Sequence, residues 1–304
     1  MTAPTAPTAL TPLLRSARRE GAAPIASRGT VARRIVDVFL RRAVPRLLVA
    51  AALLVIGGTI LSRYLSGLVT EPVEVAPGVV GERGGGAWLY ALRTGAGVVL
   101  VDAGSDRKGR PIDAALATLG STRAAVTDVL LTHGHPDETG GLAAVPRARV
   151  HAGAGDVDII AGRERPGRGL DRAVGLVLPR TTARVGDPIR GEEEIDVGGQ
   201  RVLAIPVPGH SLGSTAYLVG DLLFVGDAAS VRDGKLVPGP RFMSADPRRA
   251  ERALVRLALR LAGVDVSRIC TAHGGCSPAG SARGLIEGAA RLAGPDGGSR
   301  AGPP

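Results

Sequence analysis

The sequence is poor in cysteine and in aromatic residues, and each scarcity narrows what the chain can be. Two cysteines in 304 residues cannot hold a fold together, so a disulfide-rich scaffold is excluded. Phe, Trp and Tyr make up only 2% of the chain, which argues against a protein that binds nucleic acid by base stacking. Hydrophobic residues make up 44% and charged residues 22%, so a chain that is disordered throughout is also excluded.

The net charge of +10 is concentrated near the N-terminus. Residues 1–69 contain ten arginines and two acidic residues, so the rest of the chain carries 28 basic and 26 acidic side chains. The larger part of the chain is therefore nearly neutral, and no nucleic-acid partner is expected. Lys108 and Lys235 are the only lysines, and the codon composition of a GC-rich genome explains this arginine bias most simply.

The N-terminal region contains an uncharged run from Leu47 to Ser62, bounded by Arg46 and Arg63. As a helix this run spans about 24 Å, somewhat less than the ~30 Å hydrocarbon layer of a bilayer. Because arginine side chains reach the interface from either end, we expect a transmembrane signal-anchor helix over residues 43–69. A buried helix of a soluble domain and a cleaved signal peptide remain as alternatives.

The arginines around this run predict its orientation. Six arginines precede it closely and far fewer follow, which favours a cytoplasmic N-terminus. We therefore expect a single-pass membrane protein with a basic, disordered cytoplasmic tail at residues 1–42. The catalytic domain, residues 70–293, is expected outside the cytoplasm, followed by a disordered tail at residues 294–304. The oligomeric state stays open.

From about Val73 onward, short β-branched runs separated by Gly, Pro and Asp predict a layered α/β fold. Strands are expected at Val73–Val80, Trp88–Leu92, Val98–Asp102, Val126–Leu131, Val202–Val207, Thr215–Val219, Leu222–Val225 and Arg268–Cys270. Helices are expected at Pro111–Leu119, Gly140–Val145, Pro247–Ala262 and Ser281–Leu292.

Two of the five histidines lie close together, directly after an apolar run, in the sequence Thr132-His133-Gly134-His135-Pro136-Asp137-Glu138. A loop that leaves a strand end can direct two imidazoles and a carboxylate at one point, and these donors suit Zn, Fe and Mn. Three further candidates follow expected strands between small neighbours: His210, Asp227 and His273. The pattern predicts a metal centre.

Together these motifs resemble the metallo-β-lactamase superfamily, from about Val73 to Leu292. Asp102, in Val99-Leu100-Val101-Asp102-Ala103-Gly104, looks like that family's strand-ending D-x-G. The resemblance implies a four-layer αββα fold, preceded here by the transmembrane helix, and one or two Zn²⁺ ions. It also implies a role for each residue: His133, His135 and His210 bind the first metal, Asp137 and His273 bind the second, Asp227 bridges both, and Asp102 orients a ligand.

One position departs from the family pattern. The family usually has His directly after the motif's Asp, whereas this chain has Glu138. As a ligand, Glu138 would add charge to the second site and favour a harder ion such as Mn²⁺ or Fe²⁺. As a residue of a helix N-terminus, it would instead be stabilised by the helix dipole. Both interpretations stay open.

The resemblance implies a metal-dependent hydrolase. A metal-activated water would attack an ester, thioester, lactone or phosphoester-type small molecule, with Asp137 orienting the water and moving its proton. A mononuclear iron oxygenase on the same fold and a non-catalytic, membrane-anchored metal- or ligand-binding protein are the alternatives. No motif identifies the substrate-binding residues.

Three weaker patterns accompany these motifs. Gly209 to Gly213 matches G-x-S-x-G, but a strand rather than a helix is expected after Ser211, which argues against a serine nucleophile. Cys270 and Cys276 flank His273, so a separate zinc site, a disulfide and a buried thiol are all conceivable. His151 follows another apolar run and is either structural or a substrate contact.

Overall fold

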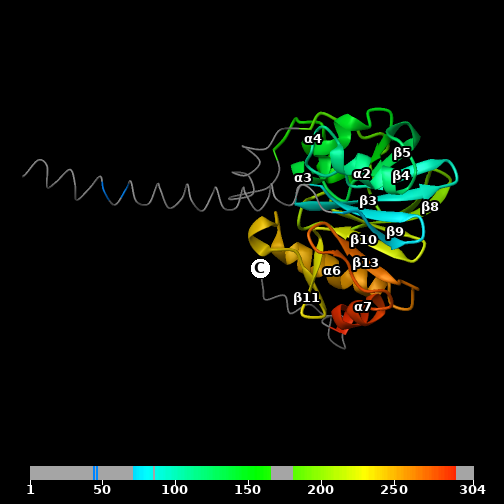
Figure 1. Ribbon diagram of the computed structural model, residues 1–304. Coiled ribbons are helices and arrows are strands. Elements are labelled where there is room, and N and C mark those ends of the chain that lie inside the picture. Colours follow the sequence, from blue (N-terminus) through cyan, green and yellow to red (C-terminus); the bar gives the residue numbers. More distant parts are fainter. Residues whose placement is uncertain (1–43, 45, 47–70, 85, 166–180, 292–304) are drawn as a thin grey trace, which may run out of the picture. The chain divides into compact units, whose positions relative to one another are not determined.

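The computed structural model describes Val44, Arg46 and residues 71–84, 86–165 and 181–291 (Figure 1). The chain divides into two units, residues 1–59 and 60–304, and the fold given below is that of the second unit. Apart from Val44 and Arg46, the expected transmembrane helix and both tails lie outside the described residues. No helix within the described ranges is both long and apolar enough to cross a membrane.

Two six-stranded sheets form the centre of the described fold. The first has the order β1-β2-β3-β4-β5-β6, with bounds β1 (Val73–Ala76), β2 (Val79–Gly84), β3 (Ala87–Thr94), β4 (Gly97–Val101), β5 (Val126–Leu130) and β6 (Arg149–His151). The second has the order β14-β13-β10-β9-β8-β7, with bounds β7 (Glu193–Val197), β8 (Gln200–Pro206), β9 (Thr215–Val219), β10 (Leu222–Gly226), β13 (Arg268–Thr271) and β14 (Gly275–Cys276). A small hairpin pairs β11 (Ala229–Arg232) with β12 (Lys235–Pro238).

Helices cover the outer face of each sheet (Figure 1). The first sheet is covered by α2 (Arg110–Thr118), α3 (Pro136–Thr139) and α4 (Val157–Ile160). The second sheet is covered by α6 (Pro247–Arg260) and α7 (Ala282–Ala290). Four short 3₁₀ turns complete the described elements: η1 (Arg123–Ala125), η2 (Gly140–Ala144), η3 (Ala154–Asp156) and η4 (Arg241–Met243). The described residues therefore form a mixed α/β fold of helix, sheet, sheet and helix layers.

The alternation of side chains along the strands explains this layering. On β4, Val98 and Leu100 pack with the helical residue Ile112, whereas Val99 and Val101 pack against the second sheet. The side chains of β10 alternate in the same way: one face packs against the first sheet, and the opposite face packs on α6 and α7. Because successive strand residues point to opposite faces, apolar residues at every position predict a strand that is buried on both sides.

The helix α6 shows how local signals place an element. Its first residue is Pro247, and the Asp246 side chain accepts a hydrogen bond of 2.9 Å from the Arg249 backbone N–H. Its buried side chains recur at helical spacing, and four of them pack onto the second sheet: Ala253, Leu254, Leu257 and Ala258. The helix predicted from Pro247 to Ala262 is therefore present with a slightly earlier end.

Two expected elements differ in detail. The single strand expected at Val73–Val80 is a hairpin, because Gly78 turns the chain with a φ of +72°. The helix expected at Gly140–Val145 is a short 3₁₀ turn, in which Gly141 lies so close to the Ala103 carbonyl that a side chain there would collide with it. The predictions do not include five strands: β6, β7, β11, β12 and β14. The strand β7, for example, lies at a sheet edge and contains three acidic residues, so it has no continuous apolar pattern.

Candidate metal centre

The candidate residues follow the carboxyl ends of strands. Asp102 follows β4, His133 and His135 follow β5, and Asp227 follows β10. The strands β4 and β5 are parallel, as are β10 and β13, so their carboxyl ends share an edge within each sheet. The strand β8 runs in the same direction as β10, because β9 is antiparallel to both. The loops that leave these strands therefore meet.

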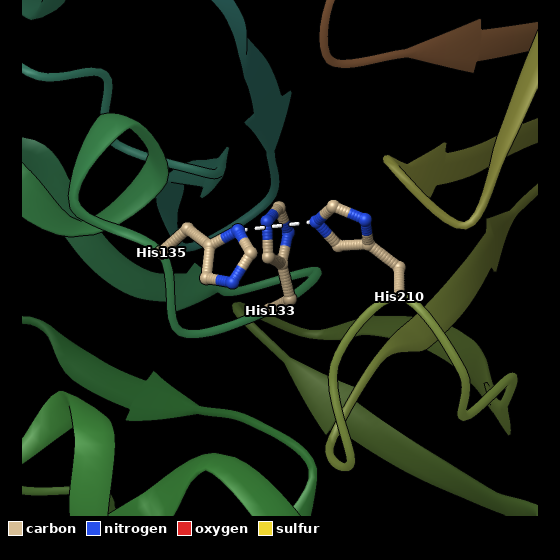
Figure 2. Close-up of side chains that lie close together, drawn as sticks. All are labelled: His133, His135 and His210. Carbon is tan, nitrogen blue, oxygen red and sulfur yellow. Dashed lines mark hydrogen bonds between the residues drawn. The ribbon is translucent and has the colours of Figure 1, made fainter. Parts of the chain in front are cut away.

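Three imidazoles converge from two of these loops (Figure 2). His133 and His135 come from the loop after β5, and His210 comes from the loop after β8. The ring centroids are 4.5–4.7 Å apart, and His210 Nε2 lies 3.1 Å from His135 Nδ1. One nitrogen of each ring lies within 4.8 Å of the other two, as ligands of a single metal ion require.

The surroundings keep His133 and His210 neutral. Burial lowers the pKa of His133 well below its usual value, and the nearby His135 and His210 rings lower it further. Burial also lowers the pKa of His210, to about 4. Neutral imidazole is the form that binds a metal ion, so these residues are ready to coordinate one at neutral pH.

Carboxylates and a more exposed imidazole lie beside this cluster. His273 Nε2 lies 3.1 Å from one Asp227 carboxylate oxygen and 3.6 Å from one of Asp137, and its side chain is 47% exposed. His210 Nε2 lies 3.5 Å from the same Asp227 oxygen. Asp227 thus lies between the buried imidazoles and His273, where a bridging ligand is expected.

His273 and Asp227 are both charged, because each stabilises the charged form of the other. Burial lowers the pKa of His273, but the hydrogen bond with Asp227 and the charges of Asp227 and Asp137 together outweigh burial and raise the pKa to about 9. Burial raises the pKa of Asp227, but the hydrogen bond with His273 and the interactions with the neighbouring histidines together outweigh burial and lower the pKa well below its usual value. Without a metal ion, the two side chains therefore form an ion pair.

Glu138 is completely buried and lies close to both groups. Its Oε2 is 3.3 Å from His133 Nε2. Its oxygens belong to two clusters of metal-ligand spacing, one with His133 and Asp227 and one with His135 and Asp137. Burial, followed by the charges of Asp137 and Asp227, raises the pKa of Glu138 well above its usual value. The helix α3, in which it lies, has only four residues, so its dipole is small.

Asp102 lies beside the cluster and is connected to His133 through Thr132. Its carboxylate accepts hydrogen bonds from the Thr132 backbone N–H at 2.8 Å and from the Thr132 hydroxyl at 2.9 Å. The Thr132 oxygen lies 3.2 Å from His133 Nδ1. The Asp102 backbone has a φ of +59°, an uncommon conformation for a residue other than glycine. Asp102 thus holds the strand end from which His133 projects, without joining the cluster.

The residues fit a metal ion because several buried polar atoms lack partners. His133 Nε2, His210 Nδ1 and both oxygens of Glu138 are buried and make no hydrogen bond. Such atoms are rare in folded proteins, since each costs desolvation energy without compensation. Imidazole and carboxylate donors together suit Zn, Fe and Mn. A bound ion would supply a partner for His133 Nε2 and Glu138.

The weaker sequence patterns have structural explanations. The Ser211 hydroxyl hydrogen-bonds to Asp156 and not to a histidine, and β9 follows it, so this serine is no nucleophile. Cys270 and Cys276 form a disulfide, which excludes a separate site of their thiolates. His151 Nε2 lies 2.8 Å from the buried Asp128 and lines a cavity of about 450 Å³ beside β6.

Sequence reasoning misses Asp156. Its buried carboxylate hydrogen-bonds to the loops that carry the three imidazoles. Its local sequence, Gly153-Ala154-Gly155-Asp156, follows β6 and resembles the glycine-flanked Asp227 after β10. This glycine-flanked Asp after a strand is the sequence pattern that could have identified Asp156, but β6 has only three residues and is too short to be recognised as a strand.

Known proteins share sequence with this chain. The family model of the metallo-beta-lactamase superfamily matches residues 82–273. A hydroxyacylglutathione hydrolase of Anaeromyxobacter dehalogenans is 32% identical over 153 residues, which is 48% of this chain and 50% of the relative. A hydroxyacylglutathione hydrolase of Yersinia pestis is 31% identical over 187 residues, which is 61% of this chain and 60% of the relative. The chain thus spans about half, or slightly more, of the length of these curated relatives.

Solved structures share the fold. A B3 metallo-beta-lactamase, described as the first with an active-site glutamic acid, superposes with a TM-score of 0.53 at 21% identity. The match covers 74% of this chain and 89% of that protein. At this identity the likeness concerns the fold.

Proposed function

The chain belongs to the metallo-beta-lactamase superfamily, and we propose that it is a metal-dependent hydrolase that cleaves a thioester or related ester of a small molecule. The observation that carries the proposal is the convergence of three buried imidazoles with three carboxylates, several of whose atoms lack partners. A merely structural cluster would be expected to satisfy these atoms by hydrogen bonds.

We assign the metal ligands in two groups. His133, His135 and His210 would hold one ion, for which zinc is the expected metal. Asp137, Glu138 and His273 would hold a second, with Asp227 between the two; the carboxylates there favour Mn²⁺ or Fe²⁺ more than a histidine-rich site would. A bound ion lowers the pKa of a coordinated water and polarises the substrate oxygen.

The chain's own residues would bind and move protons around this centre. Asp137 lies on the more exposed side, 3.6 Å from His273, where its carboxylate can orient a water molecule and accept its proton. Asp102, through Thr132, fixes the ring of His133. The buried imidazoles exclude bulk water from the opposite side of the centre.

The curated relatives support the thioester as the first substrate class to test. Both are named hydroxyacylglutathione hydrolase, an activity on a thioester. Esters, lactones and phosphoesters remain for comparison, because the loops at the centre contain no substrate motif. The redox alternative, an iron oxygenase, differs in requiring dioxygen.

The experiment is metal analysis of the purified full-length protein followed by a substrate panel. We expect bound zinc, hydrolysis of a thioester, loss of hydrolysis after chelation and recovery when zinc is added back. Hydrolysis that persists after complete metal removal would contradict the proposal. Oxygen consumption with a thiol substrate, in place of hydrolysis, would support the oxygenase.

We further propose that residues 43–69 anchor the protein in a membrane, with the N-terminus in the cytoplasm and the catalytic domain outside it. The uncharged run Leu47 to Ser62 and the arginines preceding it support this. A reporter fused after Pro304 should be active only outside the cytoplasm, and protease added to intact spheroplasts should digest the domain. A protected, cytoplasmic C-terminus would contradict this topology.

A further inference from the structure

Asp156 is a buried carboxylate that the metal centre leaves without an assigned role. It is completely inaccessible to solvent and lies at the end of η3, after β6. Within the described ranges it forms no ion pair, so its charge is compensated by hydrogen bonds alone. Burying a carboxylate costs desolvation free energy, so we expect Asp156 to have a specific role at this position.

Its two oxygens hold two different loops. Oδ2 accepts a hydrogen bond of 2.8 Å from the Gly134 backbone N–H, between the histidines of the loop after β5. The same oxygen accepts one of 2.6 Å from the Ser211 hydroxyl, and Oδ1 accepts one of 2.8 Å from the Gly213 N–H. Ser211 and Gly213 belong to the loop that carries His210, so one carboxylate joins the two sources of imidazole.

The backbones around Asp156 are shaped for this contact. A Cβ at Gly153 would lie 2.0 Å from the Gly213 carbonyl oxygen, and one at Gly155 would lie 2.5 Å from the Leu212 carbonyl carbon. A Cβ at Gly213 would in turn meet the Asp156 side chain at 2.7 Å. Glycine is therefore required on both sides, so that the segment carrying Asp156 can lie directly against the His210 loop.

We propose that Asp156 is a positioning residue that sets the spacing between His210 and the pair His133 and His135, and so sets the affinity of their common metal site. The proposal rests on the proposed function, because it presumes that these imidazoles bind metal. Charge-assisted hydrogen bonds to backbone N–H groups are strong and directional, and groups that orient ligands commonly change metal affinity by roughly 10- to 100-fold.

The principal variant is Asp156→Asn, which keeps the shape but replaces one accepting oxygen with a donating NH₂ group. In either amide orientation, a backbone N–H or the Ser211 hydroxyl then loses its acceptor. Ser211→Ala is a milder variant, because it removes the hydroxyl that bonds to Asp156 and Ser214 and leaves both backbone bonds to Asp156. Asp158→Asn is the matched control: it lies two residues further on, is exposed and pairs with Arg163.

The full-length variants are stripped of metal, and zinc binding is measured by competition with a chromophoric chelator. Co²⁺ is then added in place of zinc, since its visible spectrum reports coordination geometry. Circular dichroism and thermal unfolding of the metal-free proteins separate loss of fold from loss of geometry. We expect Asp156→Asn to fold, to bind the first zinc at least about tenfold more weakly and to change the Co²⁺ spectrum. The zinc affinity of Ser211→Ala should lie between that of Asp156→Asn and that of Asp158→Asn, which should equal the wild-type affinity.

The outcomes are distinguishable. A folded Asp156→Asn with the zinc affinity and Co²⁺ spectrum of the wild type overturns the proposal while leaving the metal centre intact. If Asp156→Asn fails to fold, Ser211→Ala decides: weaker zinc binding supports the proposal, and unchanged binding overturns it. A wild-type chain that binds no zinc contradicts the proposed function and this proposal together.

Discussion

The two halves of the metal centre differ in burial and charge. The imidazole half, His133, His135 and His210, is almost inaccessible to solvent, and burial holds down the pKa values of His133 and His210. In the carboxylate half, Asp137, Asp227 and His273, the histidine is 47% exposed and its pKa is raised to about 9 by Asp227. The imidazole half is therefore preorganised to bind a metal ion, whereas the carboxylate half must first exchange a proton and break an ion pair.

The largest effect is expected in the imidazole half. His210→Ala removes a buried ligand that the neighbouring groups cannot replace, so tightly bound metal should be lost. Because a metal ion contributes several kcal/mol to hydrolysis, kcat/KM should fall by at least about a thousandfold. Metal analysis and steady-state kinetics measure both effects. Full metal content in this variant would mean that His210 is no ligand.

Glu138 tests where one half ends and the other begins. If it is a ligand, Glu138→Ala should lose about one metal ion per chain and reduce kcat/KM by about a hundredfold, and Glu138→His should restore two ions and favour zinc. If it only stabilises α3, Glu138→Ala should cost about 0.3–1 kcal/mol of unfolding free energy and no metal. An unchanged ratio of metal to protein in Glu138→Ala would rule out the ligand role.

A smaller effect is expected in the carboxylate half. His273→Ala breaks the ion pair with Asp227 at an exposed position, so the first metal should remain and kcat/KM should fall by only about tenfold. Metal titration followed by calorimetry should show the tight site unchanged and the weaker one reduced. Loss of the tight site as well would contradict the division into two halves.

The smallest effect is expected outside both halves, at Asp128. Burial raises the pKa of this carboxyl, but hydrogen bonds from His151 and Arg149 outweigh burial and lower it below its usual value. A carboxyl with a lowered folded-state pKa stabilises the fold above its unfolded pKa of about 3.9, and that stability is lost as the pH falls through the folded pKa.

Asp128→Asn should therefore lower the melting temperature at pH 7. Below about pH 4 the melting temperature of this variant should fall less steeply than that of the wild type, with no change in metal content. Thermal unfolding followed across pH 2.5–7 measures this, with Asp158→Asn as an exposed control. An unchanged pH profile would show that the Asp128 ion pairs contribute nothing to stability.

The sequence predicts the layered α/β fold and the strands that carry the candidate ligands, because those strands are apolar on both faces and end in glycine-flanked polar residues. It predicts poorly the elements whose form depends on distant contacts. The 3₁₀ turn at Gly140–Ala144 packs closely against the backbone at Ala103, and the hydrogen-bond partners of Asp156 come from loops 22 to 57 residues away.

The candidate residues also differ in how far sequence could place them. The motif around His133 and His135 predicts their proximity directly, since both lie in one loop. Glu138 lies close to His133 because of how α3 packs, and no local sequence pattern reveals this packing. The family model and the curated relatives support the prediction of a metallo-hydrolase, and the substrate, the individual ligands and the membrane anchor remain predictions.

The most direct test of the metal centre is native mass spectrometry of the chelator-stripped protein after zinc is added back, with thioester hydrolysis measured on the same samples. We expect one or two zinc ions per chain, hydrolysis that rises with the first ion bound, and neither property in the double variant His133→Ala/His210→Ala. Wild-type protein that binds no zinc, or a double variant that binds and hydrolyses like the wild type, would contradict this expectation.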